Sequence, residues 1–571
     1  MAGFYVRPLS GTPLWAISAP YWSPKLNSAA KSVPGTHWDG AVRAHIGYPD
    51  AIQLVVEKLR EMGLNSDDGP ERDPTFAHNL PVSYTDARGY QKTGIDFVVV
   101  NSGSGALLAD EMGLGKGLQT VRALRALRRK NIVVCPAHVR GVWERPAERD
   151  VPRQFWGEFA KWWESAVVVR PYGLTPEPIR ADADVVVIHY DIVHAWVPVL
   201  LEWFNGGSIV FDEAHVLLNQ TSRRSKACRE LARVAAGRVA LTGTPPTDRV
   251  KDLFNIVDTI SPDRFGDFFP FAKRYCDAHK VDVRGPGGTT KTVYDFNGKS
   301  NIPELRKRLD WFTLRRTKRE VMSELPALTR QIVDVEVSAN RRVSISARIA
   351  GDKKRMRAAL DSAADGKLKH VLALVRSHLE EGQRVVVGTY RRSVCEQIAD
   401  AMNEIAPTRF IHGGVALTKR GAIVDKLRKV EGPCCLVANI DCASTGIDLT
   451  FASKIVMAEL VWEPRDLIQY EARAHRFGAK DPVLVQYVIA RGTGDELILH
   501  AVIGKLDNFL DLVENDAGDG LKADLDRKDE GLSRLAAALK KMGEAEVRAE
   551  KRAAKPSKAL VVKPSKKGPG K

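Results

Sequence analysis

The chain has 571 residues, of which 44% are hydrophobic and 27% are charged. A chain of this length exceeds the size at which one hydrophobic core stops growing, so we expect at least two domains. The composition excludes a disordered protein, because such chains lack the apolar surface that offsets the entropy of ordering. There is no signal peptide and no apolar run long enough to cross a bilayer, so we expect no membrane insertion.

Lysine and arginine total 86 against 70 acidic residues, which gives a net charge of +16. A basic surface concentrates polyanions, and nucleic acid is the commonest polyanion that intracellular proteins meet. The charge therefore favours a nucleic-acid partner, with a basic solvated surface as the alternative. The seven cysteines show no C-x-x-C spacing, which argues against a disulfide framework and for a reducing compartment. We expect a cytoplasmic protein, or a nuclear one if the source is eukaryotic.

The N-terminal region is rich in aromatic residues, proline and glycine, and it contains a helical stretch over 51–62. A polar run that is typical of a linker follows it. We therefore expect a small α+β module over residues 1–75.

Two series of short β-branched runs alternate with helical sequence, one over residues 80–275 and one over 336–515. Continuous apolar runs of this kind are typical of strands buried on both faces of a parallel sheet. The predicted strands are NIVVCPA, ADVVVIHY, GGSIVFDEAH and GRVALTGTP, then RVVVGTY, TRFIHGG, CCLVANI, KIVMAEL and VLVQYVI. The repetition predicts an α/β protein with two related parallel-sheet lobes in tandem.

Residues 276–335 lie between the two series and contain a glycine-rich loop at 285–290 and a basic, helical pattern over 302–325. We expect an insertion and a basic helical linker there. Residues 516–571 are charged and helical, and they end in a basic tail that we expect to be disordered. Nonspecific phosphate contact, a targeting signal and solubility are the uses that remain open for this tail.

The sequence LLADEMGLGKGLQT at 107–120 lies between an apolar run and a helical stretch. Phosphate binding needs converging N–H groups, glycines that allow close approach, a helix N-terminus and a lysine. Gly113, Gly115 and Lys116 meet these needs, although a turn before a helix would also explain them. The predicted phosphate-binding residues are Met112, Gly113, Leu114, Gly115, Lys116 and Gly117.

Carboxylates and hydroxyls follow two further predicted strands. In SIVFDEAH, Asp212 would hold Mg²⁺ and Glu213 would orient the attacking water, since magnesium prefers oxygen ligands. The alternative is a pair of acids that cap a helix. In LTGTPPTD, the hydroxyls of Thr242 and Thr244 could sense the nucleotide and couple it to the second lobe.

Two arginines in IQYEARAHRFGAK, Arg473 and Arg476, are three residues apart and would share one face if the segment is helical. Guanidinium groups placed across a cleft can stabilise the charge that develops on a γ-phosphate, so we predict this role for both. Arginines at helical spacing more often form a solvated face, and their position late in the second series favours the catalytic role.

These blocks, in this order, resemble motifs I, II, III and VI of helicase superfamily two. Further blocks resemble the Swi/Snf-type DNA translocases, and the match covers roughly residues 80–510. They are DEMGLGK, VVCPAHVRGVWERP, FDEAHVLLNQTSRRSKA, LRRTKREVMSELP, ASTGIDLTFA and EARAHRFGAKDPVLVQYVIARGTGDE. The resemblance implies two RecA-like lobes and a DNA-dependent ATPase that uses ATP and Mg²⁺.

The resemblance also implies individual roles. RGYQKTG is similar to the adenine-recognising element, so Gln91 would hydrogen-bond the base and Arg88 would stack on it or border it. Gly446 and Asp448 fall in the motif V region, where Asp448 would couple DNA to the nucleotide. Contacts with the DNA backbone are implied for the segments 136–140, 388–390 and 444–450.

The segment 25–49 resembles the HepA-related module that accompanies annealing helicases. Pro34, Gly35, Trp38 and Asp39 match its core, but a second tryptophan is missing near His45. An unrelated, aromatic-centred cap is the alternative.

The phosphate loop departs from the pattern at one position. The residue after the loop lysine is normally threonine or serine, whose hydroxyl coordinates magnesium, whereas this chain has Gly117. We expect weaker metal or ATP affinity, or slower turnover, but retained catalysis.

The predicted function is an ATP-driven motor that contacts the backbone of double-stranded DNA without sequence preference. The alternatives are a fork-remodelling or annealing helicase, which would also engage branched DNA, and a catalytically weak, nucleotide-gated DNA-binding scaffold. The compact insertions favour a bacterial or bacteriophage source.

Overall fold

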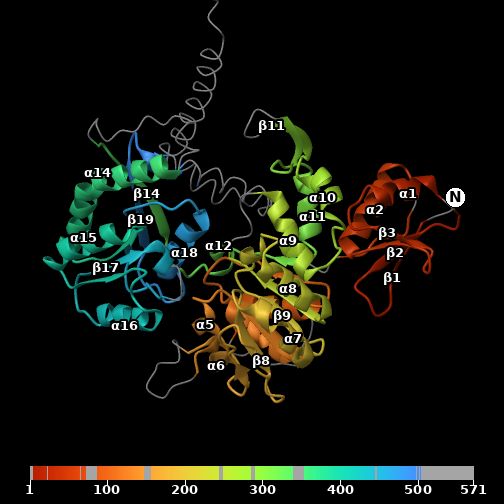
Figure 1. Ribbon diagram of the computed structural model, residues 1–571, viewed down its shortest axis with the longest axis horizontal. Coiled ribbons are helices and arrows are strands. Elements are labelled where there is room, and N and C mark those ends of the chain that lie inside the picture. The colour runs from red at the N-terminus through yellow and green to blue at the C-terminus, as the bar shows by residue number, and fades with distance from the viewer. Residues whose placement is uncertain are drawn as a thin grey trace, which may run out of the picture. The chain divides into compact units, whose positions relative to one another are not determined.

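The computed structural model describes most of the chain up to residue 502 (Figure 1). The described residues are 4–21, 23–64, 66–71, 87–146, 156–243, 249–284, 290–337, 353–443, 447–496, 498–499 and 502. All of them belong to the compact unit Met1–Val513, so the predictions for the C-terminal tail lie outside the described residues.

The N-terminal module is a four-stranded antiparallel sheet with two helices, in the order β1-β2-β4-β3. The first helix begins at Pro24 and is capped by Ser23, whose hydroxyl accepts a hydrogen bond of 3.2 Å from Leu26 N. The predicted α+β character is confirmed. The elements are β1 (Tyr5–Pro8), β2 (Trp15–Ser18), α1 (Pro24–Lys31), β3 (His37–Asp39), β4 (Ala44–Gly47) and α2 (Pro49–Glu61).

The first lobe contains a seven-stranded sheet in which every pairing is parallel, in the order β13-β5-β10-β9-β6-β8-β7. Its central strands are fully buried, which explains their unbroken apolar sequences. The strands are β5 (Ala106–Leu108), β6 (Asn131–Cys135), β7 (Val168–Val169), β8 (Val185–His189), β9 (Ser208–Phe211), β10 (Gly237–Leu241) and β13 (Thr313–Leu314).

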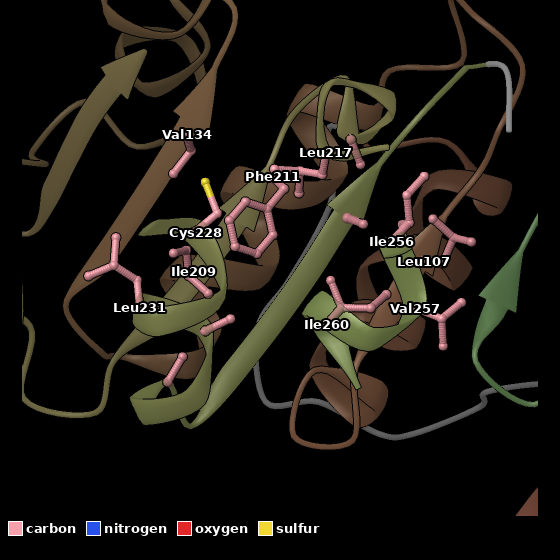
Figure 2. Close-up of a cluster of buried hydrophobic side chains, with 14 of the residues drawn as sticks. Leu107, Val134, Ile209, Phe211, Leu217, Cys228, Leu231, Ile256, Val257 and Ile260 are labelled. Atoms are coloured by element: carbon pink, nitrogen blue, oxygen red, sulfur yellow. The ribbon is translucent and has the colours of Figure 1, made fainter. Parts of the chain in front are cut away.

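Helices on both faces of this sheet form two hydrophobic clusters. Figure 2 shows one of them, in which side chains of α8 and α9 lie against side chains of the strands. The helices of this lobe are α3 (Gly89–Asn101), α4 (Lys116–Leu127), α5 (Arg140–Glu144), α6 (Glu158–Trp162), α7 (Val193–Phe204), the 3₁₀ helix η2 (Ala214–Leu217), α8 (Arg223–Val234), α9 (Val250–Ile260), α10 (Phe268–Tyr275), α11 (Ile302–Leu309) and α12 (Lys318–Val321).

The second lobe contains a six-stranded sheet, again with parallel pairings only, in the order β14-β19-β18-β15-β17-β16. All nine strands predicted for the two lobes are present, and the predicted pair of parallel-sheet lobes is confirmed. The elements are β14 (Leu328–Val335), α14 (Lys353–Glu380), β15 (Arg384–Thr389), α15 (Arg392–Asn403), β16 (Thr408–Ile411), α16 (Leu417–Arg428), β17 (Cys434–Asn439), α17 (Ile440–Ala443), β18 (Lys454–Met457), α18 (Pro464–Ala474) and β19 (Val483–Ala490).

The region predicted as an insertion and helical linker, 276–335, is more structured than expected. The glycine-rich loop joins an antiparallel pair, β11 (His279–Arg284) and β12 (Thr290–Asp295). The prediction of a helix over 302–325 is wrong in the middle, because β13 interrupts it and pairs with β5. The strand β14 belongs to the second sheet, since it pairs along its whole length with β19. No helix among the described residues is long and apolar enough to span a membrane.

Candidate nucleotide site

The phosphate loop connects β5 to the N-terminus of α4, at the carboxyl end of a parallel strand, where open α/β sheets bind ligands. Gly113 and Gly115 have φ angles of 92° and 79°, in the left-handed region that favours glycine. A Cβ on Gly115 would lie 2.5 Å from Gln91 Nε2, so a side chain there would displace the Gln91 amide. The loop thus has the conformation that brings backbone N–H groups close to a phosphate.

Lys116 is the first residue of α4, and its ammonium group lies against the loop. Its Nζ donates a hydrogen bond of 2.7 Å to Asp110 O. Burial lowers the pKa of Lys116, while the charges of Glu213, Asp110 and Asp212 act in the opposite direction. A cation that is poorly hydrated and surrounded by carboxylates is suited to an anionic ligand that carries its own metal ion.

Asp212 and Glu213 follow β9, on the same edge of the sheet as the phosphate loop. Asp212 Oδ2 accepts a hydrogen bond of 2.7 Å from Trp143 Nε1, and its Oδ1 accepts one of 2.9 Å from Glu213 N. Burial and the adjacent Glu213 carboxylate raise the pKa of Asp212 to about 7. A cation beside Asp212 would stabilise its ionised form, so this side chain fits a metal ligand.

Glu213 contacts both lobes. Burial acts to raise its pKa, but His215 and Lys116 lower it overall, so the carboxylate is ionised at neutral pH. His215 Nδ1 lies 3.3 Å from Glu213 Oε2, and Gln469 Nε2 of the second lobe donates to Glu213 Oε1 at 3.5 Å. Glu213 has the protonation state that a base or water-orienting group requires.

The two arginines of the second lobe lie near these groups. A Cβ built on Gly113 would lie 3.5 Å from Arg476 Cβ. Burial and the charge of Arg476 lower the pKa of Arg473 to about 10, which leaves it protonated at neutral pH, while Glu213 and Asp212 act to raise it. The condition for a shared helical face is not met, because α18 ends at Ala474 and Arg476 follows its cap.

Gln91 and Arg88 are the two residues predicted to recognise adenine. Gln91 is buried, and its amide donates to Leu114 O at 3.3 Å and accepts from Arg88 N at 3.0 Å. Arg88 pairs with Glu324, and its guanidinium lies 4.4 Å from the centre of the Phe477 ring. Adenine recognition by these two residues stays a prediction.

The coupling residues of the two lobes are described only in part. Thr242 directly follows β10, and a Cβ on the next residue, Gly243, would lie 3.4 Å from Lys116 Nζ. Asp448 accepts hydrogen bonds of 3.1 and 2.8 Å from Thr450 N and Oγ1. Thr244 and Gly446 lie outside the described residues.

The segments expected to contact DNA differ in their surroundings. Arg140 is buried and donates to Glu144 at 2.6 Å, so its guanidinium serves an ion pair inside the lobe rather than the surface. Tyr390 is 52% exposed and could reach a ligand in solution. Part of the third segment, 444–446, lies outside the described residues.

Sequence reasoning missed the local role of the LRRTKREV block. Arg316 pairs with Asp110 next to the phosphate loop, and Arg315 donates to Ala109 O at 3.1 Å. Lys318 is buried, lies 3.5 Å from Glu111 Oε1 and donates to His475 O at 2.6 Å. The sequence offered one sign of this role, namely the opposite charges of the DE pair at 110–111 and the RRTK block at 315–318. These residues join motif I to motif VI.

Among the described residues no group of three or more His, Cys, Asp or Glu side chains has the geometry of a metal site. Magnesium at a nucleotide does not need such a group, because it binds one or two carboxylates together with phosphate oxygens and water. Asp212 is the carboxylate that would hold it here.

The comparisons with known proteins agree with this arrangement. The model of the SNF2-related domain matches residues 90–381, just over half of the chain, and that of the helicase conserved C-terminal domain matches residues 366–478. The chain is 29% identical over 432 residues to "SWI/SNF-related matrix-associated actin-dependent regulator of chromatin subfamily A-like protein 1" of Xenopus tropicalis, which covers 72% of this chain and 43% of that protein. It is 28% identical over 434 residues to "DNA annealing helicase and endonuclease ZRANB3" of Mus musculus, covering 72% of this chain and 39% of that protein.

Among solved structures, the "Sulfolobus solfataricus SWI2/SNF2 ATPase core in complex with dsDNA" is 21% identical, covers 79% of this chain and 98% of that chain, and has a TM-score of 0.35. The chain spans less than half the length of the frog and mouse relatives. Both relatives are animal proteins, so a bacterial or bacteriophage source stays a prediction.

Proposed function

We propose, because the chain belongs to the SNF2-related family, that it couples ATP hydrolysis to movement along double-stranded DNA. The observation that carries the proposal is the contact between the lobes at the phosphate loop, where Arg476 lies against Gly113 and Gln469 reaches Glu213. A nucleotide bound at this place would touch both lobes. Its binding and release would therefore favour different arrangements of them.

In this cycle Lys116 and the loop amides would bind the phosphates, and Asp212 would hold a magnesium ion, which would supply positive charge to the phosphates. Glu213 orients the attacking water. Arg473 and Arg476 stabilise the charge that develops on the γ-phosphate, and they withdraw when the lobes separate. Alternating grip of the two lobes on the phosphate backbone would then move the protein along the duplex.

Double-stranded DNA is the polymer that we propose as the partner. The net charge of +16 favours a polyanion. The motif order resembles the DNA-directed branch of the superfamily, and the mouse relative is named for an activity on DNA. Recognition would use phosphates, which position a protein without reading base sequence.

A fork-remodelling or annealing activity is the second candidate. The mouse relative is named a DNA annealing helicase, and the N-terminal module has the Pro34, Gly35, Trp38 and Asp39 pattern. Gly35 approaches the first lobe so closely that a Cβ would lie 1.9 Å from Arg264 O. Strand annealing would therefore involve a module that is packed against the ATPase rather than loosely attached.

The proposal is tested with Glu213→Gln, which keeps the shape of the side chain and removes its charge. We expect duplex DNA to accelerate phosphate release by the wild type and the variant to lose this activity by roughly 10²-fold or more. The control is Glu230→Gln, on the exposed face of α8, which should behave as the wild type. Absence of DNA-accelerated phosphate release from the wild type would overturn the proposal and favour a nucleotide-gated scaffold.

Two assays on the same preparation separate the candidates. Displacement of a triplex-forming strand reports movement along intact duplex, and conversion of a model fork reports annealing. We expect ATP-dependent triplex displacement. Fork conversion without triplex displacement would favour the second candidate.

A further inference from the structure

Gly117 is packed against a carboxylate from another helix. A Cβ built on Gly117 would lie 2.7 Å from Glu158 Oε2 and 2.8 Å from both Glu158 Cδ and Cγ. Real Cβ atoms do not approach other atoms this closely. The carboxylate of Glu158 therefore occupies the space that a threonine or serine side chain would fill at this position.

The Glu158 carboxylate is held in place by its own helix. Glu158 is the first residue of α6, and its side chain is 17% exposed. Trp162 Nε1 donates to Oε2 at 3.0 Å, and Lys161 Nζ donates to Oε1 at 3.3 Å. These donors leave lone pairs on both oxygens, since each carboxylate oxygen can accept two hydrogen bonds.

The same segment also positions the predicted metal ligand. Trp143 in α5 donates to Asp212 Oδ2, and its ring packs against Phe159, with 5.9 Å between ring centres. Phe159 is the neighbour of Glu158 in α6. The packing of α5 on α6 therefore has two effects. It places the Glu158 carboxylate beside Gly117, and it holds the Asp212 carboxylate through Trp143.

We infer that Glu158 substitutes for the missing hydroxyl and supplies an oxygen to the hydration shell of the magnesium ion that accompanies the nucleotide. The inference rests on the proposed function, because it concerns the same nucleotide site. Magnesium readily uses one or two carboxylates together with phosphate oxygens and water. Glycine at 117 and glutamate at 158 would then form a matched pair, in which the small residue admits the larger ligand.

Nucleotide binding in the absence of DNA tests the inference. A fluorescent ADP analogue is titrated with MgCl₂, and its affinity is also measured in excess EDTA. In Glu158→Ala we expect the half-saturating magnesium concentration to rise on the order of tenfold. In EDTA we expect affinity equal to or higher than that of the wild type, because a negative charge near the phosphates has been removed.

Two further variants separate a metal role from a structural one. Glu158→Gln keeps an acceptor for Trp162 but loses the charge, so it should also need more magnesium while its thermal unfolding matches the wild type. Glu164→Ala removes an exposed acid two residues after α6 and should bind as the wild type does. A half-saturating magnesium concentration that is unchanged in both Glu158 variants overturns the inference, as does an equal loss of affinity with magnesium and with EDTA.

The reverse substitution checks the pairing directly. In Gly117→Thr the new side chain collides with Glu158, so we expect no gain in magnesium affinity. In Gly117→Thr combined with Glu158→Ala the hydroxyl has room, and the affinity should return toward the wild-type value. Failure of the double variant to improve on Glu158→Ala contradicts the pairing. A protein that binds Mg-ADP as expected but shows no DNA-accelerated hydrolysis would refute the proposed motor and leave this inference standing.

Discussion

Two clusters of buried charged side chains, one at Asp50 and one at the nucleotide site, differ in their hydrogen-bond and ion-pair partners. At the N-terminal module, Asp50 Oδ1 accepts from Arg264 at 2.9 Å and Asp50 Oδ2 accepts from Arg308 at 2.7 Å. Arg308 also donates to Pro34 O and Arg264 O, and aromatic rings cover both guanidiniums. The two oxygens of Asp50 thus bind both guanidiniums, although Arg264 Nε has no hydrogen-bond partner among the described residues.

The nucleotide site is also assembled from residues that are distant in sequence, but its ionisable groups have a different set of partners. Lys116 donates to a backbone carbonyl, and the pKa values of Asp212 and Arg473 are shifted toward their uncharged forms, chiefly by burial. The Asp50 cluster therefore joins the N-terminal module to the first lobe, whereas ionisable groups with strongly shifted pKa values at the carboxyl edge of a parallel sheet are typical of a functional site.

The largest expected effect concerns Arg473 and Arg476 at the nucleotide site. Replacing Arg473 or Arg476 with alanine should reduce DNA-stimulated ATP hydrolysis roughly 10³-fold, because one of the two guanidiniums that would stabilise the γ-phosphate charge in the transition state is then missing. Steady-state phosphate release measures this effect. Nucleotide binding should change far less, since most phosphate contacts lie in the first lobe.

The control is Lys480→Ala, which removes an exposed cation at the end of the same segment, IQYEARAHRFGAK, and should leave the rate unchanged. If either arginine variant hydrolysed ATP at a rate close to that of the wild type, the second lobe would not complete the site. The contrast between the nucleotide site and the Asp50 cluster would then not hold.

The next effect concerns the buried cluster of Asp50, Arg264 and Arg308. Asp50→Ala leaves Arg264 and Arg308 buried without their shared carboxylate, which should cost about 3–5 kcal/mol of stability. Urea unfolding followed by tryptophan fluorescence measures this loss. ATP hydrolysis at low temperature should persist, because none of these residues lies at the phosphate loop.

Asp68→Ala serves as the matched control, because it also removes a carboxylate paired with an arginine, but one whose side chain is 94% exposed. Its unfolding curve should overlay that of the wild type. Equal effects of the two substitutions would show that the buried cluster contributes no more than a surface pair.

Sequence patterns predicted the elements whose causes are local. The central strands of both lobes are apolar on both faces, so β6, β9, β15 and β17 stand out. The edge strand β14 was missed, because Arg330 and Asp334 interrupt its apolar pattern, and only its pairing with β19 makes it a strand.

The candidate site shows the same division. Lys116 and Asp212 could be predicted because each lies at a fixed place after a buried strand, and neighbouring residues in the sequence supply the rest of the motif. Glu158 and Trp143 could not, since their roles depend on which helices pack together in three dimensions, whereas the charges of the block that contains Lys318 offered a signal that went unused. The departure at Gly117 was visible in the sequence, but its partner became apparent only in the fold.

The smallest effect should come from Lys318, which belongs to neither cluster and joins the two lobes. Replacing it with methionine keeps most of the apolar stem and removes the bonds to His475 O and Glu111. ATP hydrolysis should then fall by about tenfold, the amount that 1.4 kcal/mol corresponds to, because the hydrogen bond of one charged group is lost. Arg319→Met, exposed on the same helix, is the control and should change nothing. A larger loss of DNA stimulation than of basal hydrolysis would show that Lys318 transmits the response to DNA, whereas equal losses would limit it to positioning the phosphate loop.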